Sequence, residues 1–420
     1  MWARWRALPI SAGTCCDGAA DLTRAFPGDH GLATGMASAA AKGKRKMMRQ
    51  LVLMILLGTL AACGQRGVVT VDPVARNVGT VEPIFVGTTR AFDPATGSFG
   101  AERSPVLSLA RYDISVPPNR APGEIRWPRQ GRAPDPFTEF LTVDDVIYPS
   151  ATDFRRDLSA AMRAEEGPRR RALIFVHGFN NTFAEGLYRI AQLSHDLDLP
   201  RVTVHYSWPS AGQALGYIHD RDSALFARDG LEKLFNEIVA AGVQEIIVVG
   251  HSMGAQLLVE SLRQMDIRSP GTLQRYLTGV VLLSPDIDVE VFRSQASTFG
   301  QLPQPFVIVA SDKDRALRLS SFITGQPNRL GNMSDVEQVA DLEVRVIDVA
   351  AFSTGAGHFT IGDSPELIAL MSKIGVVQAA FDNDNAGRVG LLPGLVLTAQ
   401  KATEIVVSPA MAINNELTRQ

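Results

Sequence analysis

Short runs of apolar residues alternate with longer stretches of helical periodicity from about residue 171 onward. Six runs have the length of a strand and a nearly continuous Val, Ile and Leu content: Ala172–Val176, Val202–Tyr206, Glu245–Val249, Val280–Leu283, Phe306–Ala310 and Val344–Val349. Such content is typical of strands buried on both faces. The remaining periodicity predicts helices over 183–197, 222–241, 253–265 and 364–374. This alternation predicts βαβ units, and therefore a mostly parallel central sheet flanked by helices.

The chain before this region has a different pattern. Residues 64–150 are rich in Pro and Gly and contain three short β-type runs, Ile84–Val86, Val106–Leu109 and Ile114–Val116. We therefore expect 63–150 to form a linker and a small N-terminal flanking segment that contains a few strands. The main domain is expected over 151–376, with a C-terminal tail over 377–420.

Composition and charge narrow the class of protein. Of the 420 residues 45% are hydrophobic and 20% charged, which is typical of a globular chain with a sizeable core. The net charge of -3 does not favour binding of nucleic acid through bulk charge. The three cysteines are Cys15, Cys16 and Cys63, all before the expected domain. A disulfide framework, a cysteine metal site and a cysteine nucleophile are therefore excluded from the body of the protein.

The N-terminal region has the parts of an export signal. A positive cluster over 42–49 precedes an apolar run from Leu51 to Ala62, which is shorter than the roughly 20 residues of a membrane-spanning helix. This predicts a signal peptide over 47–62, with 1–46 as an upstream extension from a start codon chosen too early. The alternatives are an ordinary signal peptide with a chance cysteine, or a buried helix.

The end of the apolar run, Leu60-Ala61-Ala62-Cys63, resembles a bacterial lipobox. In such sequences the cysteine is lipidated and becomes the first residue of the mature chain, so Cys63 is the expected anchor to the membrane. Residue 64 is Gly rather than Asp, which by the same resemblance favours the outer membrane. We therefore expect a lipoprotein of the bacterial cell envelope, on the periplasmic side.

The sequence Gly250-His251-Ser252-Met253-Gly254 fits the pattern G-x-S-x-G. The pattern alone is weak, but here it follows a predicted strand and opens a predicted helix. Strand, tight turn and helix form the nucleophile elbow of the α/β-hydrolase fold, in which small residues flank a strained serine. Ser252 is therefore the candidate nucleophile, supported by Gly250 and Gly254.

A serine hydroxyl needs a base to accept its proton, and that base needs an acid to orient it. His358 is the only histidine after Ser252, in a Gly-rich loop that follows the last predicted strand. Asp314 is the preferred acid because it lies four residues past the strand Phe306–Ala310. The alternatives are Asp312, and Asp286 or Asp288 after an earlier strand.

Two backbone N–H groups are needed to stabilise the oxyanion of an acyl-transfer intermediate. Met253, directly after the nucleophile, is expected to give one. Phe179 is expected to give the other from the turn after the first predicted strand of the domain, where Gly178 allows close approach of the backbone. His177 and Trp208 are interpreted as structural residues more than as catalytic or pocket residues.

Together these stretches resemble a family. The chain is similar to bacterial α/β-hydrolases grouped as domain of unknown function 900, which are esterase- and lipase-like. The matching stretches are Phe85–Arg90, Tyr112–Pro118, His177–Asn180, Tyr206–Ser210, Gly250–Gly254 and Asp312–Leu319. The resemblance covers roughly 80–375 and implies the α/β-hydrolase fold, a catalytic domain and an esterase activity, without a settled substrate.

The leading hypothesis is a serine hydrolase that cleaves a carboxylic ester of a small molecule or lipid through an acyl-enzyme. No metal or organic cofactor is implied, because the sequence has no His-Glu-x-x-His pair, and the pair Gly355-x-Gly357 lacks the strand and spacing of a dinucleotide-binding loop. The alternatives are a catalytically silent envelope protein that uses the fold for binding or scaffolding, and an acyltransferase. Tyr217, Asp220 and Asp222 are interpreted as the start of a solvated helix rather than as part of a site.

Overall fold

The computed structural model describes residues 66–350, apart from gaps at 130, 165–169, 200–201, 327, 334–335 and 340, and the backbone of 396–400 and 402–406. The expected signal peptide, Cys63, His358 and the helix expected over 364–374 lie outside the described residues. None of the helices in the described part of the chain is long and apolar enough to cross a bilayer.

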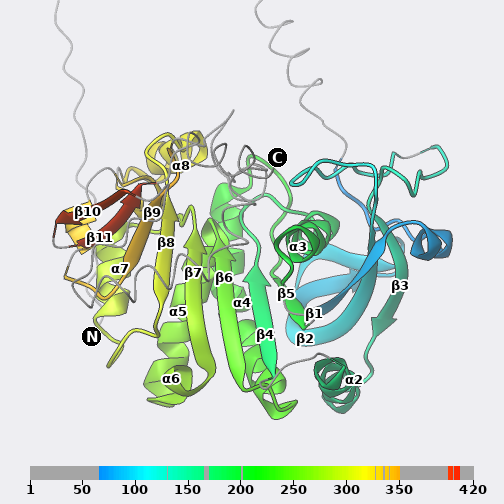
Figure 1. Ribbon diagram of the computed structural model, residues 1–420, viewed down its shortest axis with the longest axis horizontal. Coiled ribbons are helices and arrows are strands. Elements are labelled where there is room, and N and C mark those ends of the chain that lie inside the picture. Colours follow the sequence, from blue (N-terminus) through cyan, green and yellow to red (C-terminus); the bar gives the residue numbers. More distant parts are fainter. Residues whose placement is uncertain are drawn as a thin grey trace, which may run out of the picture. The chain divides into compact units, whose positions relative to one another are not determined.

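One sheet of eleven strands runs through the described residues, in the order β10-β11-β9-β8-β7-β6-β4-β5-β1-β2-β3 (Figure 1). Its strands are β1 (Thr80–Asp93), β2 (Ser98–Val116), β3 (Leu141–Ile147), β4 (Arg171–Val176), β5 (Thr203–Ser207), β6 (Glu245–His251), β7 (Leu277–Leu283), β8 (Phe306–Ala310), β9 (Arg345–Asp348), β10 (Val396–Gln400) and β11 (Ala402–Val406).

The α-helices are α2 (Ala151–Arg163), α3 (Phe183–Leu197), α4 (Tyr217–Ala240), α5 (Met253–Arg268), α6 (Thr272–Tyr276), α7 (Val289–Ala296) and α8 (Arg315–Thr324). Short 3-10 helices are η1 (Pro73–Asn77), η2 (Leu330–Asn332) and η3 (Val336–Val339).

The centre of the sheet is parallel. Strands β4 to β9 pair in parallel with their neighbours, whereas β1 with β2, β2 with β3, and β10 with β11 are antiparallel. The connection from β5 through α4 to β6 crosses back over β4, so the strand order reverses between β4 and β6. Ligands of open α/β sheets bind at the carboxyl ends of strands at such a reversal. The predicted architecture, a mostly parallel central sheet flanked by helices, is confirmed.

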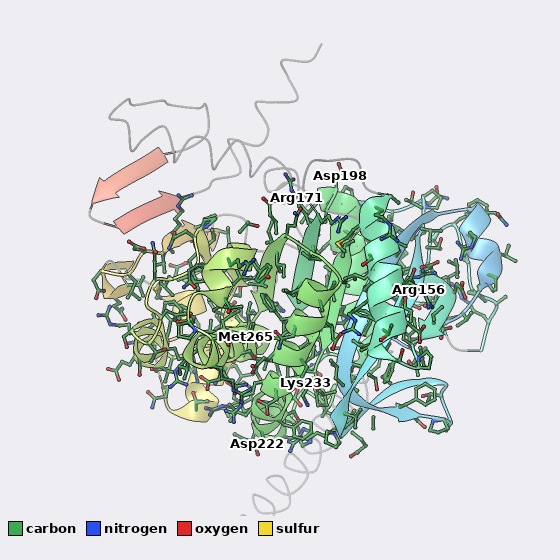
Figure 2. The ribbon with its side chains drawn as sticks, turned by 90° about the horizontal axis from the view of Figure 1, so that it is seen from below. Arg156, Arg171, Asp198, Asp222, Lys233 and Met265 are labelled. Atoms are coloured by element: carbon green, nitrogen blue, oxygen red, sulfur yellow. The ribbon has the colours of Figure 1, made fainter. Side chains whose placement is uncertain are left out.

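Alternate residues of the central strands enter two separate cores, one on each face of the sheet. Ile174 belongs to the core that holds residues of α4 and α5, whereas Phe175 belongs to the core that holds residues of α3. Accordingly, α3 and α4 lie on opposite faces (Figure 1). Figure 2 shows α4 and α5, marked by Lys233 and Met265, on the same face. Both faces of the central strands are therefore covered, as their continuous apolar sequence predicts.

The N-terminal flanking segment is built into this sheet. Ile84 of β1 pairs with Tyr112 of β2 on one side and in parallel with Thr203 of β5 on the other. The three β-type runs of the sequence lie inside β1 and β2, which are much longer. The middle of β2 around Glu102 has exposed side chains and is held in the sheet by its backbone. Its sequence therefore lacks the apolar residues by which a strand is predicted. The expected C-terminal tail likewise contributes β10 and β11, and β11 pairs with β9.

Helix boundaries follow local capping where the sequence provides it. Helix α3 has the predicted bounds because Thr182 and Glu185 form a capping box, in which each side chain accepts a hydrogen bond from the other's backbone N–H. Helix α4 starts at Tyr217, earlier than predicted. Its N-cap residue is Gly216, so no side chain caps the helix. Helices α2, α6, α7 and α8 were not predicted, since each is short or preceded by an irregular segment.

Candidate active site

Ser252 occupies a strained turn between β6 and α5. Its backbone has φ 53° and ψ -122°, outside the regions that a side-chain-bearing residue prefers. The Ser252 N–H donates to the carbonyl of Leu283 at 2.9 Å, and the Ser252 carbonyl accepts from the N–H of Ala255 at 3.0 Å and of Asp286 at 3.2 Å. These bonds hold a conformation that would otherwise relax. The serine is placed as the G-x-S-x-G pattern predicts for a nucleophile elbow.

Three glycines leave the space that this turn needs. A Cβ on Gly250 would lie 2.7 Å from the Cα of Ala255, and one on Gly178 would lie 2.6 Å from Nδ1 of His251 and 3.0 Å from Cβ of Ser252. A Cβ on Gly254 would overlap the carbonyl oxygens of Val176 and His177. The elbow, the first turn of α5 and the end of β4 therefore pack against one another through backbone.

The turn after β4 lies beside the elbow. Val176 pairs with Gly250 across the parallel strands, so the residues that follow Val176 lie next to those that follow Gly250. Met253 N–H is in the first turn of α5, where backbone donors have no intrahelical partner. Phe179 N–H has no backbone acceptor among the described residues. The two expected oxyanion donors are thus on neighbouring segments at the carboxyl edge of the sheet.

Asp314, the preferred acid, is fully buried after β8 and caps α8. Its Oδ1 accepts from the N–H of Leu317 at 3.0 Å, and its own N–H donates to the carbonyl of Ser311 at 3.1 Å. The positive end of the α8 dipole stabilises a carboxylate at this place. Asp312, the neighbouring alternative, is exposed.

The alternatives from the earlier strand have structural roles. Asp286 is buried, and its Oδ1 accepts from Oγ of Ser320 at 2.8 Å while its Oδ2 accepts from Oη of Tyr217 at 2.8 Å. Nε of Arg329 lies 3.3 Å from Oδ1 as an ion pair without hydrogen-bond alignment. Asp288 caps α7 by accepting from the N–H groups of Glu290 and Val291. Both oxygens of Asp286 are therefore engaged by residues of the surrounding helices.

The geometry agrees with the comparison with known families. The family described as α/β hydrolase of unknown function (DUF900) matches residues 150–373, more than half of the chain. The chain belongs to this family. The resemblance expected from the sequence is confirmed, and the protein is an α/β hydrolase.

Solved structures similar to this hydrolase share little sequence with it. A candidate hydrolase from Agrobacterium vitis S4 is 11% identical, with a TM-score of 0.32, over 71% of this chain and 98% of its own. A Trichoderma reesei cutinase in complex with a phosphonate inhibitor is 10% identical, with a TM-score of 0.23, over 53% of this chain and 89% of its own. Among curated proteins, none matches this sequence.

His177 of the hydrolase is enclosed by backbone and by Trp208. The two rings are stacked, with centroids 5.0 Å apart and planes 9° from parallel. Nε2 of His177 lies 3.1 Å from the carbonyl oxygen of Trp208, and Nε1 of Trp208 donates to the carbonyl of His177 at 2.6 Å. Burial, then the charge of Arg90, hold the pKa of His177 well below its usual range. A neutral, enclosed imidazole is not suited to proton transfer, and it packs into the turn over 177–181, which we name the oxyanion turn after its expected donor, Phe179.

Arg90 is a buried cation. In the sequence it stands out only as the last residue of Phe85–Arg90, one of the stretches that resemble the family. Its guanidinium donates to Oγ of Ser207 at 3.0 Å, to the carbonyls of Gly100 and Ser210 at 2.9 and 3.0 Å, and to the carbonyl of Asn181 at 2.9 Å. Burial lowers the pKa of Arg90 to about 9. These bonds join the end of β1 to the loop after β5 and to the oxyanion turn.

The interpretation of the start of α4 as solvated is wrong for two of its three residues. Asp220 is fully buried, and its carboxylate accepts from Oγ of Ser210 at 2.6 Å and from the N–H of Ala211 at 2.7 Å. Tyr217 is also buried, and its ring packs edge-on against Phe179 with centroids 5.4 Å apart. Asp222 is exposed, as expected. A lone aspartate in a helical stretch gives no sign that a distant loop will cover it.

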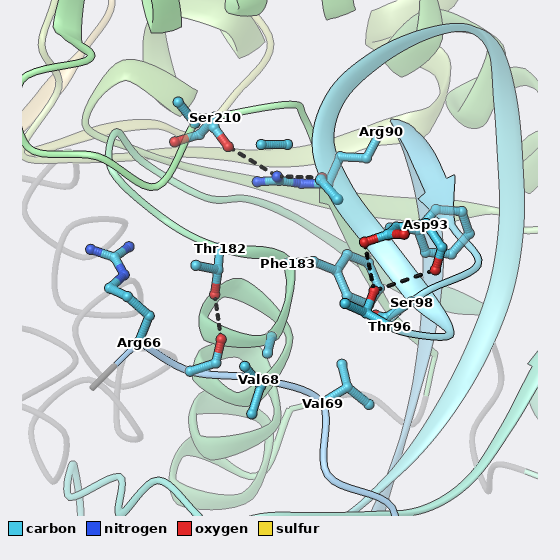
Figure 3. A pocket seen from close by; sticks show the side chains of 16 residues that line it. Arg66, Val68, Val69, Arg90, Asp93, Thr96, Ser98, Thr182, Phe183 and Ser210 are labelled. Carbon is cyan, nitrogen blue, oxygen red and sulfur yellow. Dashed lines mark hydrogen bonds between the residues drawn. The ribbon is translucent and has the colours of Figure 1, made fainter. Parts of the chain in front are cut away.

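Among the cavities that the described residues enclose, two lie near the oxyanion turn. The larger of these two, of about 470 Å³, is beside the N-terminus of α3, with Arg90 and Ser210 on one wall and Val68, Val69 and Phe183 on others (Figure 3). Ser252 does not line it.

The smaller cavity, of about 140 Å³, is adjacent to the elbow and is lined by His177, Gly178 and His251, among others. No group of three His, Cys, Asp or Glu side chains that could hold a metal occurs within the described ranges.

Proposed function

We propose that this hydrolase cleaves carboxylic esters, with Ser252 as the nucleophile. The observation that carries the proposal is the backbone of Ser252 at φ 53°, held between β6 and α5 beside the turn that contains Phe179. A side-chain-bearing residue keeps such strain where the surrounding structure over-determines it, and this occurs mostly at functional sites. Here the strain presents a hydroxyl at the reversal of strand order, where ligands bind.

In the first half of the proposed reaction, Oγ of Ser252 attacks the acyl carbon as His358 accepts its proton. The carbonyl oxygen of the substrate becomes an oxyanion and accepts hydrogen bonds from the N–H groups of Phe179 and Met253. Asp314 stabilises the imidazolium of His358 and fixes its tautomer. The C–O bond of the ester then breaks, and the alcohol leaves with the proton from His358.

In the second half, His358 takes a proton from water, and the resulting hydroxide attacks the acyl carbon of the Ser252 ester. The same two N–H groups receive the new oxyanion. The intermediate collapses, the acid product leaves, and the proton on His358 returns to Oγ of Ser252. All proton transfers therefore pass through one imidazole, as in other acyl-enzyme mechanisms.

A fluorophosphonate probe tests the nucleophile. The wild type is expected to be labelled and Ser252→Ala is not. Ser284→Ala is a matched control, because Ser284 also ends a central strand at positive φ, of 43°, and should keep its labelling. An unlabelled but folded wild type would favour the silent scaffold, and equal labelling of Ser252→Ala would disprove the assignment.

The class of substrate is tested with p-nitrophenyl esters of increasing acyl length. Turnover that is lost in Ser252→Ala supports the esterase, and the preferred length reports the size of the acyl site. Added alcohols distinguish the acyltransferase, since that enzyme would form a new ester in place of the free acid.

We further propose that Cys63 is lipidated and anchors the protein to the periplasmic side of the outer membrane. The support is the sequence Leu60-Ala61-Ala62-Cys63 after a short apolar run and a positive cluster. Incorporation of labelled palmitate by the wild type and its absence in Cys63→Ser are expected. A mature protein that retains residues 1–46 would refute the proposal.

A further inference from the structure

Helix α8 carries an exposed apolar stripe. Leu319, Phe322 and Ile323 are 60%, 83% and 44% exposed, and their spacing of three and four residues places them on one side of the helix. The opposite side, with Leu317 and Ser320, is buried. The helix is therefore apolar on the side that faces solvent as well as on part of its inner side, which is unusual for a short surface helix.

The stripe lies at the rim of the proposed active site. Helix α8 begins at the carboxyl end of β8, and Oγ of its Ser320 donates to Asp286. The other oxygen of Asp286 accepts from Tyr217 at the start of α4, and the N–H of Asp286 donates to the carbonyl of Ser252 at 3.2 Å. One buried aspartate therefore joins α8, the start of α4 and the backbone of the nucleophile.

The start of α4 has exposed apolar residues of its own. Leu215, just before the helix, is fully exposed, and Ile218 in its first turn is 61% exposed. Since Tyr217 and Ser320 bind the same carboxylate, these two residues and the stripe of α8 flank the same point. Together, Leu215, Ile218, Leu319, Phe322 and Ile323 form what we name the apolar rim.

Charges beside the rim favour an anionic surface. The exposed charged side chains at the beginning of α8 and just before it are Lys313, Arg315 and Arg318, with Asp312 as the only exposed acid between 312 and 323. A helix with an apolar face and flanking Lys or Arg is typical of binding to the interface of anionic lipids.

The described part of the chain begins at the same edge. Arg66, three residues after Cys63, donates from Nη1 to Oδ1 of Asn180 at 3.0 Å and from Nη2 to the carbonyl of Asn180 at 2.7 Å. Asn180 belongs to the oxyanion turn. Three residues span at most about 11 Å along any path. An acyl group on Cys63 would therefore insert close to the edge that carries Ser252.

We propose that the apolar rim docks on the surface of a lipid bilayer, so that Ser252 faces the membrane and takes its ester from membrane lipids. The proposal rests on the proposed esterase function and anchor, and it deepens them by naming the orientation and the class of substrate. Leu215, Ile218 and Phe322 enter the headgroup region, and Lys313, Arg315 and Arg318 contact lipid phosphates.

Quenching by lipids tests the orientation without any need for catalysis. The full chain, with Cys15 and Cys16 replaced by serine, is produced with one new cysteine, Phe322→Cys, Leu215→Cys or Ile267→Cys, and labelled with a fluorophore. Ile267 is the control, because it is 57% exposed at the far end of α5, at the opposite edge of the sheet. The lipidated proteins are reconstituted in phosphatidylethanolamine–phosphatidylglycerol vesicles with and without doxyl-labelled lipid.

We expect doxyl lipid to lower the fluorescence about twofold or more at 322 and 215, and by less than about a tenth at 267, because interfacial insertion reaches 5–10 Å. Equal quenching at all three positions, or none at 322, would overturn the proposal. The proposal would also be overturned if the fluorescence at 322 fell with increasing protein density on the vesicles and did not change with doxyl lipid. That result would assign the apolar rim to contact with a second copy of the chain. Labelling of the parent protein at Cys63 would remove the anchor and refute the orientation, whereas loss of esterase activity alone would not affect this readout.

Discussion

Oη of Tyr217 donates to Oδ2 of Asp286 at 2.8 Å, so that, with Ser320 at Oδ1, both oxygens of this buried carboxylate already accept a hydrogen bond. Burial, then the charge of Asp286, raise the pKa of Tyr217, so the phenol remains a donor. The distinction between Asp286 and Asp314 as the acid of the triad can therefore be tested by exchanging each carboxylate for its amide.

Asp314→Asn is expected to lower kcat by about 10⁴-fold, because an amide cannot hold the productive tautomer of the histidine. Asp286→Asn is expected to keep kcat within about tenfold of the wild type but to lower the free energy of unfolding by about 3 kcal/mol, since it leaves Arg329 without its buried partner. Ester hydrolysis and urea unfolding measure the two effects. A larger loss of kcat in Asp286→Asn would exchange the two assignments.

Gly254→Ala is expected to lower the free energy of unfolding by about 3 kcal/mol or more and to abolish turnover. The new methyl group would overlap the carbonyls of Val176 and His177, and backbone cannot move aside as a flexible side chain does. Gly279→Ala is the matched control. Its Cβ would meet only Ile247 side-chain atoms at 3.7 Å, so the change in stability should stay within about 1 kcal/mol. Wild-type turnover in Gly254→Ala would contradict the close packing of elbow and turn.

Arg90→Lys tests whether the buried cation positions the oxyanion turn. An ammonium cannot reproduce the fork of bonds to Asn181, Ser210, Gly100 and Ser207, so the turn should shift by a fraction of an ångström. We expect kcat to fall about 10- to 100-fold with a small change in KM.

The control for Arg90 is Arg103→Lys, in which an exposed arginine that contacts Ser223 and His219 is altered. This variant should keep the wild-type kcat. A fall in stability of Arg90→Lys with unchanged kcat would limit Arg90 to a role in folding.

The burial of His205 predicts that the folded protein loses stability in acid. It is fully buried, neither ring nitrogen has a hydrogen-bond partner among the described residues, and burial lowers its pKa to about 3. The unfolded chain binds a proton near pH 6.5 and the folded one does not, so stability falls as the pH drops from 6.5 toward 3. At pH 5 this amounts to about 2 kcal/mol.

His205→Leu removes this group at similar volume. Urea unfolding at pH 7.5 and pH 5 should show a drop about 2 kcal/mol smaller in the variant than in the wild type. The difference between the two proteins carries the prediction, because other acids and His177 titrate in both. An equal drop in both proteins would show that His205 is not the cause.

The sequence predicted the parts of the fold whose causes are local. The strand Phe306–Ala310 and helix α3 have the predicted bounds, the first because its residues are continuously apolar and the second because Thr182 and Glu185 cap it. The elbow was also predictable, since Gly250 and Gly254 each lie two residues from Ser252 in the sequence.

Contacts between distant segments could not be predicted in this way. The burial of Asp220 depends on Ser210 and Ala211 folding over it, and the engagement of Asp286 depends on Tyr217 and Ser320, 69 and 34 residues away. Neither partner is marked by a pattern in its own segment. For the same reason the sequence left open the choice between Asp314 and Asp286.

The parallel pairing of β1 with β5 affects the order in which the sheet folds. Thr88, the last residue of β1 that pairs with β5, donates to the carbonyl of Ser207, 119 residues later in the sequence. The hairpin of β1 and β2 is local in the sequence, but the other edge of β1 has no neighbour until β5 pairs with it. Pairing over such a separation is slow, and an unpaired edge recruits other chains. Until β5 joins it, this edge of β1 is therefore the part of the sheet that is open to aggregation.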